Sequence, residues 1–142
     1  MQNITVSGKN EEADRLSVAG IIADTVISSD TVIAGNFNIT GKAADKLDTW
    51  GIKAEDSVTQ IKDISGKFNV SADTGGNTVT AIGVQAFALT MDKFSGKMTI
   101  KSSGNADYGV YSFAAGLYTT QDNLKITDGF SGSITVNAKD KR

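Results

Sequence analysis

Five short segments of this chain alternate apolar and polar residues in one shared pattern. They are residues 3–7, 33–40, 64–71, 94–101 and 130–137, which read NITVS, IAGNFNIT, ISGKFNVS, FSGKMTIK and FSGSITVN. Alternation with period two is typical of a β-strand with one buried face. The central apolar anchors are 33, 31, 30 and 36 residues apart, and they are Ile4, Phe37, Phe68, Met98 and Ile134. A strand that returns about every 30 residues indicates an internal repeat.

A second motif, a glycine between larger residues, follows each of the first four strand segments. Its copies are residues 19–23 (AGIIA), 50–54 (WGIKA), 82–86 (IGVQA) and 108–112 (YGVYS). Two independent motifs that recur in the same order confirm that the repeat is real. A third, less regular strand is expected in each unit, around Val26, Val58, Leu89 and Leu117.

Strands that recur at this period can stack in register, so that each coil hydrogen-bonds to the next. The sequence therefore predicts an all-β fold: a single-stranded parallel β-helix (β-solenoid) of about four coils of ~30 residues, with three short strands per coil and a triangular section. Residues 1–142 form one domain, with repeats at about 1–32, 33–63, 64–93 and 94–129 and a partial repeat at 130–142. The glycine before each main strand is expected to mark a tight corner with an unusual backbone angle. The alternative is an antiparallel sandwich, which does not require one motif at a near-constant period.

A resemblance to a known class of proteins follows from these motifs. The segment FSGKMTI from Phe94, followed by YGVYS from Tyr108, resembles repeats in very large adhesin-like and autotransporter passenger proteins of bacteria. The resemblance implies a secreted β-helical stalk displayed on the outer surface. The chain begins with residues 1–5 (MQNIT), which lack the basic and apolar regions of a secretion signal. We therefore expect an extracellular or cell-surface location for a mature or excised piece with an added Met1.

Composition narrows the range of functions. The net charge is −2, and the 14 basic residues are spread along the sequence. Nucleic acid and anionic membranes call for a concentrated basic surface, so neither is an expected partner. The chain contains no Cys and no His, which removes disulfides, thiolate nucleophiles and the commonest general base. We expect a structural or adhesive segment without catalytic, cofactor or metal sites, and with a surface glycan or a protein as ligand.

Lysine follows glycine four times, which suggests a phosphate-binding loop. The pairs are Gly8-Lys9, Gly41-Lys42, Gly66-Lys67 and Gly96-Lys97. The spacing does not fit such a loop: Gly35 to Gly41 encloses five residues instead of four, and Ala43 stands where Ser or Thr is needed. We interpret these residues as solvent-facing lysines that recur at a coil corner.

The alternative function is a carbohydrate-binding or polysaccharide-cleaving β-helix. Cleavage of a glycoside would need two carboxyl groups about 5 to 9.5 Å apart. The carboxyl pairs considered are Asp45 with Asp48 and Asp92 with Asp107. A groove of clustered Asp, Lys and aromatic side chains would favour this alternative, whereas uniform polar ladders would favour the structural role.

Aromatic side chains offer a further route to ligand contact. Trp50 and Tyr108 take the positions of Ala19 and Ile82 in other copies, so we expect them in the core. Tyr111 and Tyr118 then remain as the candidates for ligand contact. Terminal coils of a solenoid need capping, and no segment here reads as a cap. We therefore expect end-to-end self-association. The N-terminal coil is expected to be the more adherent end, because residues 139–142 (KDKR) place charged side chains at the C-terminal end.

Overall fold

A computed structural model describes residues 3–10, 15–23, 30–54, 58–76, 78–104 and 111–140. These ranges contain β-strands and no helix. The strands are β1 (Ile4–Asn10), β2 (Arg15–Ala23), β3 (Val32–Ile33), β4 (Phe37–Ala43), β5 (Lys46–Ala54), β6 (Val58–Ile64), β7 (Lys67–Thr74), β8 (Thr78–Ala86), β9 (Ala88–Phe94), β10 (Lys97–Gly104), β11 (Tyr111–Thr119), β12 (Leu124–Phe130) and β13 (Ser133–Asp140).

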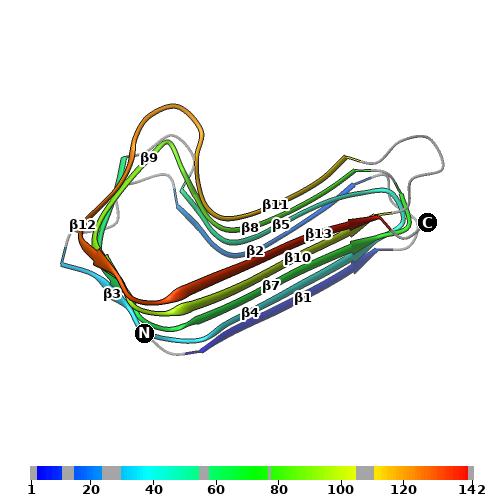
Figure 1. The fold of residues 1–142 in the computed structure, drawn as a ribbon. Helices are drawn as coiled ribbons and strands as arrows, with labels where there is room; N and C mark the ends of the chain where they lie inside the picture. The colour runs from blue at the N-terminus through cyan, green and yellow to red at the C-terminus, as the bar shows by residue number, and fades with distance from the viewer. Residues whose placement is uncertain are drawn as a thin grey trace.

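The strands form three parallel sheets that the chain visits in turn. Sheet A has the order β1-β4-β7-β10-β13, sheet B has β11-β8-β5-β2, and sheet C has β12-β9-β6-β3. Each coil contributes one strand to each sheet, and β13 begins a fifth coil (Figure 1). The structure is therefore a β-solenoid of about four turns with three strands per coil, which confirms the predicted fold class.

The register of sheet A is the one that the repeated motif predicts. Phe68 is paired with Phe37 on one side and with Met98 on the other, and Met98 in turn with Ile134. These inward side chains fill the core: Phe37, Phe68 and Met98 are fully buried. The rings of Phe37 and Phe68 stack with centroids 4.3 Å apart. Burial of this apolar column stabilises the stack by removing apolar surface from water.

Sheet B contains a column of glycines, Gly20, Gly51, Gly83 and Gly116. The ladder of paired residues skips each of these positions. A Cβ atom on Gly83 would lie 2.6 Å from the carbonyl oxygen of Gly116 and 2.9 Å from Sδ of Met98. Only glycine lets the backbone of sheet B approach the core of sheet A this closely. The coil outline is indented along sheet B in Figure 1, so the section is not a plain triangle.

A second glycine column lies where sheet C turns into sheet A. The expectation that these glycines are needed for an unusual backbone angle was wrong. Among the described residues, only Gly129 has a positive φ angle. A Cβ atom on Gly66, Gly96 or Gly132 would instead collide with the carbonyl oxygen of the glycine one coil earlier. Close stacking of successive coils, and not an unusual backbone angle, therefore requires glycine here.

Two assignments in the fourth repeat were also wrong. Leu117 lies in β11 and pairs with Val84 in sheet B, whereas Leu124 is the residue that pairs with Leu89 in sheet C. The fourth copy of the glycine motif is thus residues 115–117, not residues 108–112. Val58 and Leu89 lie in sheet C as expected, and Val26 lies outside the described residues.

Both ends of the stack expose apolar side chains. In the first coil, Val18 and Ile33 are buried, with 4% and 1% of their surface exposed, whereas Ile22 is 62% exposed and Val32 is 42% exposed. In the last coil and β13, Phe130 is 50% exposed and Val136 is 43% exposed. The expectation that the N-terminal coil is the more adherent end therefore stays a prediction.

Candidate functional site

The outer face of sheet A is a regular polar surface that spans five strands. We call it the lysine face. Side chains alternate strictly across sheet A, so every second residue of its strands points to solvent. The outward residues are Thr5, Ser7, Lys9, Asn38, Thr40, Lys42, Lys67, Asn69, Ser71, Asp73, Lys97, Thr99, Lys101, Ser103, Ser133, Thr135, Asn137 and Lys139. All of them are polar.

Positive charge is concentrated on this face. Its lysines are Lys9, Lys42, Lys67, Lys97, Lys101 and Lys139, and its one carboxylate among the described residues is Asp73. The whole chain, by contrast, has a net charge of −2. Sheet A therefore carries a positive surface on an acidic protein.

The strand register explains why the lysines gather. Lys67 is opposite Lys97, on strands about 4.8 Å apart. Lys42 is opposite Lys9 on one side and Asp73 on the other. Like charges directly opposite each other in a sheet are unfavourable for folding, and a bound anion relieves that repulsion. The expectation that the basic residues are scattered was wrong, because residues about 30 positions apart become neighbours in the stack.

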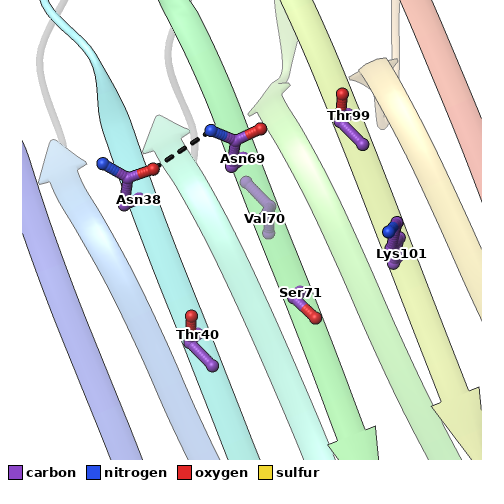
Figure 2. A pocket seen from close by; sticks show the side chains of 7 residues that line it. All are labelled: Asn38, Thr40, Asn69, Val70, Ser71, Thr99 and Lys101. Atoms are coloured by element: carbon purple, nitrogen blue, oxygen red, sulfur yellow. Dashed lines mark hydrogen bonds between the residues drawn. The ribbon is translucent and has the colours of Figure 1, made fainter.

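An open hollow of about 190 Å³ lies within the lysine face. Its lining residues are Asn38, Thr40, Asn69, Val70, Ser71, Thr99 and Lys101. Nδ2 of Asn69 donates a hydrogen bond to Oδ1 of Asn38 at 3.0 Å, and the two amides lie side by side on β4 and β7 (Figure 2). The hollow thus presents amide, hydroxyl and ammonium groups together.

The outer side of sheet B carries the aromatic residues. Trp50 is buried, with 7% of its surface exposed, but it does not belong to the main core cluster. Gly51 faces Phe68, so its neighbour Trp50 points the other way. Nε1 of Trp50 donates to Oε1 of Gln85 at 2.9 Å, and Nζ of Lys53 lies 4.3 Å from the ring centroid. The expectation that Trp50 is buried is confirmed, and its ring packs outside the main cluster of core side chains.

The two tyrosines singled out from the sequence both lie on β11. Tyr118 is 37% exposed and contacts the ring of Phe113 edge to face, with centroids 5.3 Å apart. It therefore stays accessible on the outer side of sheet B. The side chain of Tyr111 lies outside the described residues, as does Tyr108. Ligand contact by Tyr111 and Tyr118 stays a prediction.

The candidate carboxylates do not form one described centre. Asp48 lies on sheet B and accepts a hydrogen bond from Nη2 of Arg15 at 2.7 Å. Asp92 is exposed on β9 of sheet C, Asp45 lies in the turn before β5, and Asp107 lies outside the described residues. Within the described ranges, no group of three or more Asp or Glu side chains is placed to hold a metal ion.

One buried carboxylate has a structural explanation. Asp63 is 5% exposed. Its Oδ2 accepts a hydrogen bond from Oγ of Ser95 at 2.7 Å, and its Oδ1 accepts one from the Ser95 amide at 3.1 Å. Nζ of Lys93 lies 3.9 Å from Oδ2. A buried charge needs such partners, and these hold the corner of the second coil to that of the third.

No helix in the described part of the chain is long and apolar enough to cross a membrane. Comparison with known proteins gave no match, whether to a family model, to a curated protein or to a solved structure.

Proposed function

We propose that this chain is a structural and adhesive segment of a secreted or surface-exposed bacterial protein, without catalytic activity. The observation that carries the proposal is the lysine face, where five strands in register display repeated polar side chains. Such a surface repeats one set of contacts on successive coils instead of converging on one reacting centre. That arrangement suits attachment to an extended ligand.

The stack itself supports the structural part of the proposal. Each inner coil is hydrogen-bonded through three sheets to the coils before and after it. Solenoids of this kind are stabilised by contacts between neighbouring coils, so they can be built to any length. A stalk that holds an adhesive surface away from a cell needs that property.

The placement of the described carboxylates supports the absence of catalysis. Acid–base cleavage of a glycoside needs two carboxyl groups that face the same bond. Asp48 and Asp92 belong to different sheets, and Asp48 is engaged by Arg15.

A binding experiment tests the proposal. Fluorescently labelled protein is incubated with an array of bacterial and host-cell glycans and with whole cells, and the glycans are then assayed for new reducing ends. We expect saturable binding without cleavage. Absence of binding to every glycan and cell surface would contradict the adhesive role, and reproducible cleavage would contradict the non-catalytic one.

A further inference from the structure

We propose that the lysine face binds an acidic polysaccharide, a chain of sugars that carry carboxylate or sulfate groups. The inference rests on the proposed adhesive function and names the class of ligand. Its starting point is the imbalance of charge on this face, where six lysines accompany one described carboxylate.

The first argument is charge complementarity. The Lys67 and Lys97 side chains are exposed and directly opposite each other, and Lys101 is exposed on the same strand as Lys97. The ion pairs of Arg15 with Asp48 and of Lys93 with Asp63 lie on other parts of the molecule. A polyanion laid on sheet A would place negative charge between lysines that otherwise repel each other.

The second argument is the chemistry between the lysines. Columns of Thr, Ser and Asn side chains run across the strands, and the hollow at Asn38, Asn69 and Lys101 combines both kinds of group. Hydroxyl and amide groups both donate and accept hydrogen bonds, as sugar hydroxyls do. Lysine supplies only donors and a charge, which suits a carboxylate or sulfate. A sugar chain with acidic groups needs both partners.

The third argument separates sugars from other polyanions. Single-stranded nucleic acids bind by stacking their bases on aromatic side chains, and the described outward residues of sheet A include none. Membrane binding by a surface element normally combines basic residues with inserted apolar ones, and the outward residues of sheet A are all polar. Double-stranded DNA is a convex cylinder, which touches a flat sheet along a narrow line.

Repetition of the face also fits a polymer. Strands lie about 4.8 Å apart, and outward residues along a strand are about 6.6 Å apart, so the surface is a regular lattice. An extended chain that crosses the strands meets similar side chains on each coil, as in the row Thr5, Asn38, Asn69 and Thr99. Each repeated contact adds to the same binding event, so weak single contacts give measurable affinity.

Two triple variants with the same change in charge test the proposal. The first is Lys67→Gln/Lys97→Gln/Lys101→Gln on the lysine face. The control is Lys46→Gln/Lys62→Gln/Lys125→Gln, whose side chains are exposed on sheets B and C. Each variant removes three positive charges from a chain of net charge −2. A difference between them therefore reports the position of the charges and not their number.

Binding is measured by biolayer interferometry against immobilised polygalacturonate, dextran sulfate and neutral dextran. We expect the unmodified protein and the control to bind an acidic polymer, and the face variant to bind at least about tenfold more weakly, from the loss of several exposed ion pairs. The slope of log affinity against log salt concentration should be smaller in magnitude by about two to three for the face variant, because its binding releases fewer counterions. Neutral dextran should not bind.

Thermal unfolding checks that the face variant is folded. Its melting temperature should equal or exceed that of the unmodified protein, because Lys67 and Lys97 no longer repel each other. Equal loss of affinity in both triple variants, or no loss in either, would overturn the assignment of the site. Tighter binding to double-stranded DNA or to phosphatidylserine vesicles than to either acidic sugar polymer would overturn the class of ligand.

The outcomes also separate this inference from the proposed function. If the protein adheres to cells or neutral glycans but to no acidic polymer, the adhesive role stands and the acidic polysaccharide is refuted. If it binds neither cells nor any glycan, both fail.

Discussion

Replacement of Phe68 by alanine tests the register on which the whole interpretation depends. Phe68 is fully buried in β7, stacked on Phe37 with an interplanar angle of 13° and paired with Met98. Because it belongs to an inner coil, its removal leaves a cavity with core side chains on both sides. Large-to-small changes of this kind cost about 3–5 kcal/mol.

The cost can be converted into a shift in melting temperature. Unfolding entropy of about 2.1 cal/mol/K per residue gives roughly 0.3 kcal/mol/K for a chain of this length. A loss of about 3–5 kcal/mol then lowers the melting temperature by about 10–17 °C. Circular dichroism in the far ultraviolet, followed during heating, measures the shift directly.

Two controls make the result specific. Phe130→Ala removes the same side chain from the last coil, where Phe130 stacks on Phe94 with centroids 5.0 Å apart but is 50% exposed. We expect about half the loss, since only one side of the ring is covered. Asn69→Thr, at an exposed position next to Thr99, should change stability by less than about 0.5 kcal/mol. The register would be refuted if Phe68→Ala had the same melting temperature as the unmodified protein. A melting temperature no lower than that of Phe130→Ala would refute it as well.

Three further predictions concern stacking, activity and association. Gly66→Ala should unfold the third coil or lower the melting temperature strongly, because its Cβ atom would meet the backbone oxygen of Gly35. The control Gly75→Ala should have a mild effect, because the nearest neighbour of its Cβ atom is 3.3 Å away. Equal effects of the two substitutions would show that coil stacking does not select glycine. We expect no turnover of polysaccharides, esters or nucleotides, and reproducible release of reducing ends from any purified glycan would contradict this. Light scattering over a wide range of concentration should show end-to-end association of the protein. Val136→Lys should weaken this association, because Val136 is 43% exposed at the C-terminal end. A protein that stays monomeric at high concentration would contradict the prediction.

Much of the fold could be read from the sequence because its signals are local and repeated. The alternation around Phe37, Phe68 and Met98 identifies the inward side of each strand, since side chains of a strand alternate between its faces. The near-constant spacing of those residues then predicts which of them are neighbours, because identical coils can stack only in register. Both predictions were correct for every strand of sheet A.

The fourth repeat could not be assigned in this way. Residues 108–112 match the glycine motif as well as residues 115–117 do, and the 36-residue spacing in this unit leaves either alignment open. The ladder decides between them, because Leu117 pairs with Val84 and Ala115 with Ile82. A local pattern cannot make this choice, since it contains no information about the partner strand.

The role of the glycines and the lysine face were decided only by the tertiary structure. The sequence by itself determined that Gly66 and Gly96 recur and that a lysine follows each of them. It did not determine that Gly96 recurs because the carbonyl of Gly66 lies against it, nor that Lys67 and Lys97 stand side by side. Both facts depend on distances between residues about 30 positions apart, and those distances exist only once the coils are stacked.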